Sequence, residues 1–413
     1  MKILCCADIH MGRIPSVPYL ENLTSHSSWD AIVEKALELD VAVLVLSGDV
    51  VEQEEHWFEA YGPLLSGLEK LGSAGIQVIG VGGNHDYSVF PRLARESPFI
   101  KIVGLGGNWE HFDYKGVRFV GWSFAQRSMK ENPLDSLPND FLDTNLPMLG
   151  LLHCDVGTDS TTPYAPVPNS AFSQTGIPWW VLGHIHKGGF IGGGNAFYCG
   201  SPYALDSNEE GMHGVWLLER QENSSSRISW QDPVLLQLCP YRFETCTIDV
   251  EGAASEEQLL TSLTQGLRVF ASSLEWSGTL LCKLLLTGRI ARTLDIPKIL
   301  TREHLESLWI PVGEGAVRTL ASYEDRTVLD IDLENLSSGK DAIALLANKL
   351  LDDQEVQTLA QHYRRLDEES FNARPYQRLE LNLKSEEEYM HLAREGAKRL
   401  LFAMINKSQG GRV

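Results

Sequence analysis

Short runs of apolar residues alternate with segments of helical periodicity through the first half of the chain. Polar residues or glycines end each run at once, a pattern typical of strands buried on both faces of an α/β sheet. Two segments of helical length separate the first three runs. We expect central strands at Ile3–Ala7, Val41–Leu46, Ile76–Val81, Met148–Leu152 and Trp179–Leu182, and helices at Trp29–Leu39 and Glu54–Leu71.

Four further segments are expected to be strands, and their short spacing is typical of hairpins. They lie at Trp109–Tyr114, Val117–Trp122, Asn195–Cys199 and Val215–Leu218. Together with the central strands they predict two packed sheets flanked by helices, because a single parallel sheet would not need the hairpins.

A polar stretch with three consecutive serines near Gln221–Ser226 separates this first domain, residues 1–238, from the rest. The pattern then predicts a small α+β domain over residues 239–337. Its expected elements are strands at Thr245–Val250 and Leu280–Thr287 and helices at Ser255–Ser272 and Thr301–Trp309. Residues 338–413 are expected to be a helical C-terminal segment.

The last helix has a clear start. Ser385 and Glu388 have capping-box spacing. One apolar stripe at helical spacing follows, formed by Tyr389, Leu392, Ala393, Ala397, Leu400 and Met404. Such a stripe packs inside its own domain or docks a partner, and both interpretations stay open here.

Composition indicates an ordinary globular chain. Of its 413 residues, 43% are hydrophobic and 22% charged, and no apolar run has the length of a membrane span. The start reaches Asp8 too soon for a signal peptide, and the seven cysteines contain no Cys-x-x-Cys pair. We therefore expect a cytoplasmic protein with reduced, buried thiols and no membrane association.

The net charge of −20 excludes a nucleic-acid binder that works through an overall basic surface. It does not exclude an enzyme whose bound metals supply positive charge locally. Residues 283–302 are a basic stretch with Asp295 as its single acid, and they include Lys283, Arg289, Arg292, Lys298 and Arg302. These side chains either contact a nucleic-acid backbone or form a solvated face, and Arg13 is a second candidate contact.

The residues that end the central strands are metal-ligand types. The strand ends carry Asp8 and His10, then Gly48-Asp49, then Gly83-Asn84-His85-Asp86, then His153, and finally Gly183-His184-Ile185-His186. Ligands bind at the carboxyl edge of open α/β sheets, and the glycines let backbone approach a bound group. These nitrogen and oxygen ligands are too many for one tetrahedral ion. Their number suits two ions that share a carboxylate, which is the arrangement used to hydrolyse phosphate esters.

In order and spacing these motifs resemble the calcineurin-like metallophosphoesterases, whose motifs run Asp-x-His, Gly-Asp, Gly-Asn-His-Asp or -Glu, a single His, and Gly-His-x-His. The resemblance implies a four-layer α/β/β/α sandwich with a dinuclear site. One metal would be held by Asp8, His10, Asp49 and His186, and the other by Asp49, Asn84, His153 and His184. Two divalent ions, two carboxylates and a hydroxide would leave the site near +1, so it could attract a phosphodiester. The resemblance also implies that His85 steadies the phosphate and protonates the leaving oxygen, with Asp86 orienting His85.

Further features are similar to SbcD-type DNA repair exonucleases, including a YhaO-like branch. They are the opening Asp8-Ile9-His10-Met11-Gly12, the Gly200-Ser201-Pro202 element and the α+β module. The resemblance implies a manganese-dependent 3′–5′ exonuclease with single-strand endonuclease activity. It also implies a cap domain, a homodimer and an SbcC-like ATPase partner that binds a C-terminal helix.

Two other functions are compatible with the sequence. The acidic balance favours a phosphodiesterase of small nucleotide substrates, whereas the additional domains favour a polymer. A non-catalytic scaffold subunit would be expected to lack a ligand, and none is missing.

Overall fold

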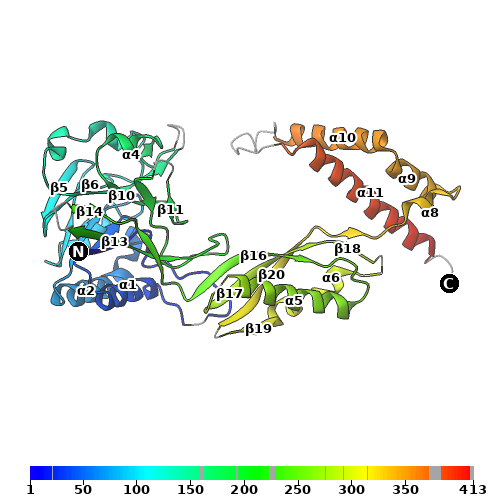
Figure 1. The fold of residues 1–413 in the computed structure, drawn as a ribbon, viewed down its shortest axis with the longest axis horizontal. Helices are drawn as coiled ribbons and strands as arrows, with labels where there is room; N and C mark the ends of the chain where they lie inside the picture. The colour runs from blue at the N-terminus through cyan, green and yellow to red at the C-terminus, as the bar shows by residue number, and fades with distance from the viewer. Residues whose placement is uncertain are drawn as a thin grey trace. The chain divides into compact units, whose positions relative to one another are not determined.

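The computed structural model describes residues 1–20, 22–157, 162–191, 194–222, 228–274, 276–291, 293–313, 315–371 and 383–409. The candidate contact Arg292 lies outside these residues. The chain divides into two compact units (Figure 1). The first is Met1–Glu244 with Gly278–Leu281, and the second is Thr245–Ser277 with Cys282–Val413.

The first unit contains two large sheets, as expected. The strand order in one sheet is β14-β13-β1-β2-β3-β4, with β15 also paired to β13, and in the other it is β11-β12-β10-β7-β6-β5. Strands β1 to β4 run parallel, as do β6, β7, β10 and β12, and β5–β6 is an antiparallel hairpin.

The strands of the first sheet are β1 (Lys2–Cys6), β2 (Val43–Ser47), β3 (Gln77–Val81), β4 (Ile100–Ile102), β13 (Gly214–Glu222), β14 (Ile228–Trp230) and β15 (Val234–Gln237). Those of the second are β5 (Trp109–Tyr114), β6 (Val117–Trp122), β7 (Met148–His153), β10 (Trp179–Gly183), β11 (Gly189–Phe190) and β12 (Ala196–Tyr198), and a separate pair is formed by β8 (Asp155–Val156) and β9 (Pro166–Val167). The helices are α1 (Ser27–Glu38), α2 (Trp57–Ser73), α3 (Val89–Ala94) and α4 (Ala171–Gln174), with 3-10 turns η1 (Glu54–His56), η2 (Pro133–Ser136) and η3 (Asn139–Leu142).

Alternating side chains of the strands fill the core on both faces of each sheet. In β1, Cys5 packs between the two sheets, whereas Cys6 packs against α1 and α2 on the outer face. The outer face of the second sheet is covered by α4 and by the segment that holds η2 and η3. The layers are therefore helix, sheet, sheet, and helix with turns, which confirms the predicted fold.

A four-stranded sheet has the order β16-β17-β20-β19, and all of it except the first residues of β16 and β17 belongs to the second unit. Its strands are β16 (Tyr241–Asp249), β17 (Thr279–Thr287), β19 (Trp309–Val312) and β20 (Gly315–Asp325), and its helices are α5 (Glu256–Ser273), α6 (Ile296–Ile299) and α7 (Arg302–Ser307). A short parallel pair joins β18 (Arg289–Ile290) to β21 (Val328–Leu329). The helix predicted to end at Trp309 stops earlier, because Trp309 starts β19 and pairs with Arg318.

The C-terminal part is helical, as predicted, with α8 (Leu333–Ser337), α9 (Ala342–Leu351), α10 (Asp353–Phe371) and α11 (Glu386–Gln409). The capping box is confirmed, since the Glu388 amide donates to Ser385 Oγ (3.2 Å) and the Ser385 amide to Glu388 Oε2 (2.7 Å). No helix in the described part of the chain is long and apolar enough to cross a membrane.

The predicted apolar stripe of α11 is only partly correct. Leu392 and Leu400 are 44% and 56% exposed. Tyr389, Ala393 and Ala397 are buried as predicted. Leu401 and Ile405, which the stripe did not include, are buried with them, and all five pack against α9 and α10. The small alanines let the neighbouring helices approach closely, so the contact line runs through them and not through the two leucines.

Candidate metal centre and active site

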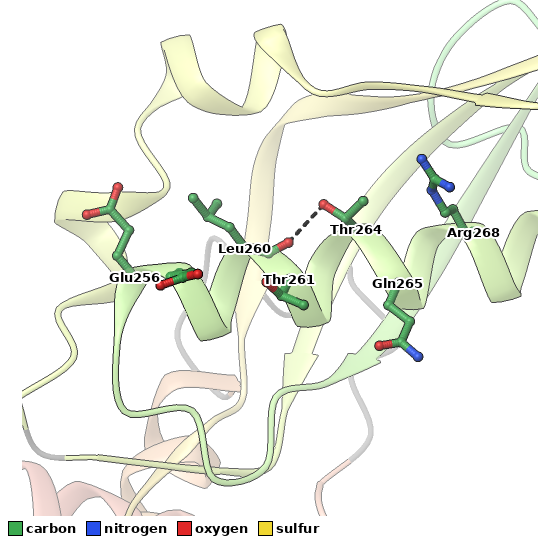
Figure 2. A pocket seen from close by; sticks show the side chains of 7 residues that line it. Glu256, Leu260, Thr261, Thr264, Gln265 and Arg268 are labelled. Atoms are coloured by element: carbon green, nitrogen blue, oxygen red, sulfur yellow. Dashed lines mark hydrogen bonds between the residues drawn. The ribbon is translucent and has the colours of Figure 1, made fainter.

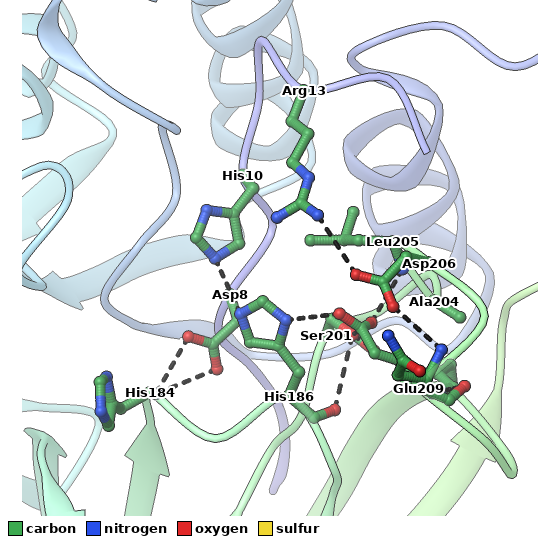
Figure 3. A network of polar contacts seen from close by, with 12 residues as sticks. Asp8, His10, Arg13, His184, His186, Ser201, Ala204, Leu205, Asp206 and Glu209 are labelled. Atoms are coloured by element: carbon green, nitrogen blue, oxygen red, sulfur yellow. Dashed lines mark hydrogen bonds and ion pairs between the residues drawn. The ribbon is translucent and has the colours of Figure 1, made fainter. Parts of the chain in front are cut away.

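The carboxyl ends of β1, β2, β3, β7 and β10 bring the predicted ligands together, although they come from both sheets. Backbone hydrogen bonds hold the first two strand ends in register, from the Asp8 amide to the Gly48 carbonyl and from the His10 amide to the Asp49 carbonyl, both 3.0 Å. The fifth strand end is tied in by the His184 amide, which donates to the two Asp8 carboxylate oxygens at 3.0 and 3.1 Å (Figure 3). Segments far apart in sequence thus meet at one edge.

Asp8, His10 and His186 form one group of potential ligands, with one atom of each lying within 4.8 Å of the others. The Nε2 atoms of His10 and His186 face each other at 3.1 Å (Figure 3). The Nδ1 atoms point the other way, to carboxylates of Glu52 (2.6 Å) and Glu209 (2.7 Å). A carboxylate at Nδ1 favours the tautomer whose lone pair is on Nε2, so both lone pairs point into the same space.

Asp49, Asn84 and His153 form the neighbouring group. His153 Nε2 lies 3.2 Å from Asp49 Oδ2 and 3.0 Å from Asn84 Oδ1. Asp8 belongs here as well, because Asp8, Asp49 and His153 offer atoms within 4.8 Å of one another. The His184 ring stands beside the His153 ring, with centroids 5.3 Å apart. The seven predicted ligands therefore gather in two adjoining groups.

The backbone is strained at these residues. Positive φ angles occur at Asp8 (52°), His10 (51°), Asp49 (51°) and His184 (103°). Residues with a side chain adopt this left-handed region at a free-energy cost, and such residues concentrate at functional sites. Each occurs where the chain leaves a strand and must turn a ligand sharply toward the site.

Glycine is required at two neighbouring positions because the site is tightly packed. A Cβ atom on Gly83 would lie 2.1 Å from Asp49 Oδ1, and one on Gly48 would lie 2.5 Å from His153 Nδ1. Gly48 also has a φ of 89°. Larger residues at either position would push a ligand out of place.

Burial makes the charges of the site interdependent. Burial raises the pKa of Asp8, whereas at Asp49 burial is outweighed by His153, which holds the pKa of that carboxyl well below its usual range. Burial opposes ionisation of His153 too, but the Asp49 carboxylate raises the pKa of His153 to about 9. Burial, reinforced by His153, lowers the pKa of His184 to about 3.

These residues fit a pair of divalent cations. Two lone pairs facing each other at 3.1 Å and two buried carboxylates are unfavourable unless positive charge lies between them. Imidazole nitrogens mixed with carboxylate and amide oxygens are a donor set for zinc, iron or manganese.

Glu52 and Glu209 were not predicted from the sequence. Besides binding His186, Glu209 accepts hydrogen bonds from Ser201 Oγ (2.9 Å) and the Leu205 amide (2.8 Å). Carboxylates of this kind orient metal-binding histidines and make them more basic. The Gly200-Ser201-Pro202 element was the nearest available signal, because its serine fixes Glu209.

His85 lies beside the metal ligands, and its amide donates to Asp49 Oδ1 (2.9 Å). The expectation that Asp86 orients His85 is wrong. The Asp86 carboxylate accepts from the amides of Val50 (2.7 Å) and Gly83 (2.7 Å), while His85 Nδ1 contacts the Glu52 carbonyl oxygen (3.0 Å). Asp86 is fully buried and stabilises the turns that carry the ligands, and its burial raises its pKa to about 7.

Ion pairs offset several of the basic side chains suggested as nucleic-acid contacts. Acids neighbour Arg289 (Glu251, 2.9 Å), Lys298 (Asp295, 2.7 Å), Arg302 (Glu306, 2.7 Å) and Arg13 (Asp206, 3.5 Å). Lys283 is exposed on β17. Glu251 and Glu306 lie outside the basic stretch, so a count along the sequence could not include them.

The second unit has a hollow of its own, of about 800 Å³, along one face of α5 (Figure 2). Its lining consists of Glu256, Glu257, Leu260, Thr261, Thr264, Gln265 and Arg268. The Thr264 hydroxyl is used within the helix, donating to the Leu260 carbonyl (2.8 Å). The hollow contains none of the metal-ligand groups found in the described part of the chain, so its size alone indicates no chemistry.

Comparisons with known proteins find similar sequences and structures. Residues 1–188 match the calcineurin-like phosphoesterase family. Uncharacterized metallophosphoesterase YhaO of Bacillus subtilis is 26% identical over 288 residues, 67% of each chain. DNA double-strand break repair protein Mre11 of Methanopyrus kandleri is 23% identical over 303 residues, 64% of this chain but only 63% of that protein.

A dimetal phosphatase from Danio rerio is a similar solved structure, 16% identical, covering 58% of this chain and 99% of that chain with a TM-score of 0.36. The family match over residues 1–188 and the ligands gathered at the strand ends lead to one conclusion. This part of the chain belongs to the calcineurin-like phosphoesterases, metal-dependent hydrolases with a dinuclear centre.

Proposed function

We propose that this phosphoesterase is a nuclease, a manganese-dependent 3′–5′ exonuclease on duplex DNA that also cuts single strands. One observation carries the proposal, namely the meeting of seven ligands and His85 at one edge of the two sheets. The name of the Methanopyrus relative, a DNA double-strand break repair protein, supports DNA as the substrate.

In this proposal Asp8, His10, Asp49 and His186 hold one ion, and Asp49, Asn84, His153 and His184 hold the other. When bound, the ions supply a nucleophile at neutral pH and positive charge for the phosphate. His10 and His186 are kept basic by Glu52 and Glu209. Asp49 would be shared by the two ions, and the His85 amide donates to one of its carboxylate oxygens.

His85 is the general acid. Its Nδ1 donates to the Glu52 carbonyl oxygen (3.0 Å), which fixes the ring and leaves Nε2 to carry the transferable proton. When the bond from phosphorus to the leaving oxygen breaks, this proton neutralises the alkoxide.

The second unit would serve the same reaction. We propose that residues 239–337 act as a cap at the DNA entry, and that residues 338–413 dock an SbcC-like ATPase, with the nuclease as a homodimer. The exposed Leu392 and Leu400 on α11 support docking, because the helix keeps apolar side chains on its outer face. Seven buried cysteine thiols support a cytoplasmic location.

The test is digestion of an end-labelled DNA duplex with manganese, comparing wild type with His85→Ala. We expect progressive shortening from the 3′ end by the wild type and a loss of about 100-fold or more in the variant. His362→Ala, at an exposed position of α10, is the matched control and should cut like the wild type.

A small nucleotide diester is the second candidate substrate, favoured by the charge of −20 and by the ion pairs that offset the basic side chains. If the duplex stays intact while bis(p-nitrophenyl) phosphate is hydrolysed, the metal centre stands and the DNA proposal fails.

A further inference from the structure

A hollow of about 460 Å³ adjoins His85 on the surface of the first unit. It is lined by Gln53, Glu55, His85, Tyr87, Ser88 and Arg127. Three strand ends build it, because these residues follow β2, β3 and β6. Its size is within the range of small-molecule sites and suits a single nucleotide unit.

The hollow has a defined place in the reaction. None of the seven predicted metal ligands lines it, whereas His85 does. The phosphate that is cut must lie at the ligands, and His85 must face the leaving oxygen. The space beyond His85 therefore lies on the side of the leaving group.

Arg127 gives the hollow a charge suited to a phosphate. Its side chain is exposed, and no acid is within ion-pair distance of it among the described residues. This distinguishes Arg127 from Arg289, Lys298 and Arg302, which have acidic partners. A guanidinium can bind phosphate oxygens in bidentate fashion.

Tyr87 and Gln53 supply the other recognition chemistry. Tyr87 is half-buried and packs against the core of the second sheet, so its ring is a fixed aromatic wall for a sugar or base. Gln53 is half-buried too and offers an amide. Glu55 is the one acid in the lining, so Arg127 is the lining residue whose charge attracts a phosphate.

We propose that this hollow binds the nucleotide that carries the leaving oxygen, and that Arg127 binds the phosphate on the far side of that nucleotide. The inference rests on the proposed nuclease function and deepens it. It makes Arg127 a specificity residue that favours a nucleic-acid strand over a diester with a single phosphate.

The experiment compares wild type, Arg127→Gln and the control Lys70→Gln on two substrates. Lys70 is exposed near the end of α2, and its substitution removes the same charge. The substrates are a single-stranded oligonucleotide and bis(p-nitrophenyl) phosphate, which has no second phosphate. We expect Arg127→Gln to lower kcat/KM about tenfold on the oligonucleotide only, and to weaken its salt dependence by about one phosphate contact.

A second oligonucleotide carries an uncharged methylphosphonate as the phosphate next to the scissile one. The methylphosphonate should slow first-bond cleavage by the wild type. It should not change the rate of first-bond cleavage by Arg127→Gln. The inference is overturned if Arg127→Gln lowers kcat/KM equally on both substrates, or on neither. In either case the proposed function still holds as long as the wild type cleaves DNA. A wild type that leaves the oligonucleotide intact overturns both.

Discussion

Single side chains of the centre are held by partners that keep their orientation fixed. Glu52 and Glu209 bind the Nδ1 atoms of His10 and His186, and Asp86 accepts backbone amides of the turns beneath. These contacts fix the donor atoms before an ion arrives. The free-energy cost of ordering the ligands is therefore borne by folding and not by metal binding.

Substitution of Glu209 by Gln tests this arrangement. The amide keeps the size of the side chain but loses the charge that makes His186 basic, so we expect metal affinity to fall about tenfold or more. Titration calorimetry with manganese measures the change. Glu69→Gln, at an exposed position of α2, should leave affinity unchanged, and a wild-type affinity in the Glu209 variant would contradict the role.

Gly83→Ala tests the packing of the turn. The added Cβ would lie 2.1 Å from Asp49 Oδ1, so we expect a destabilisation of about 1–3 kcal/mol and loss of bound metal. Thermal unfolding and metal analysis would show both. Gly62→Ala is the matched control, because no atom lies within 4 Å of its Cβ and alanine favours the helix α2.

The ligands themselves could be predicted from the sequence, because each directly follows a short apolar run and strand ends of one sheet meet at one edge. Their partners could not. Glu52 and Glu209 stand at no fixed spacing from the histidines they bind. Asp86 was misassigned because its position next to His85 in sequence does not show that the turn directs its carboxylate to backbone amides.

Elements were predicted well where hydrophobic periodicity was strong, as in the central strands and in α5. The contact face of α11 was predicted only in part, since the stripe included the exposed Leu392 and Leu400 and omitted the buried Leu401. Which side chains a helix buries depends on how closely its neighbours approach, and the sequence of the helix alone does not contain that distance.

Adjacent leucines of α11 provide the corresponding experiment. Leu401 is fully buried and Leu400 is 56% exposed. We expect Leu401→Ala to destabilise the second unit by about 2–5 kcal/mol and Leu400→Ala by less than about 0.5 kcal/mol. Denaturant unfolding, monitored by hydrogen exchange of the α11 amides, measures the stability of each variant. Equal destabilisation by the two substitutions would contradict the assignment of Leu401 to the buried face of α11.

At the scale of the whole molecule, an acidic chain carries a site built to receive anions. The charge of −20 is spread over both units, whereas the donor atoms of the centre lie within a few ångströms of one another. Long-range repulsion between exposed charges is screened over about 8 Å in physiological salt. The net charge therefore describes the surface of the protein, whereas the residues of the site determine its chemistry.

The metal ligands lie far apart along the chain, and this separation determines when the metal centre can form during synthesis. His10 and His186 touch across 176 positions of sequence, and one belongs to each sheet. During synthesis the donor set is complete only after residue 186 has been added. Binding of the ions by all seven residues therefore requires that β1, β2 and β3 of one sheet have met β7 and β10 of the other.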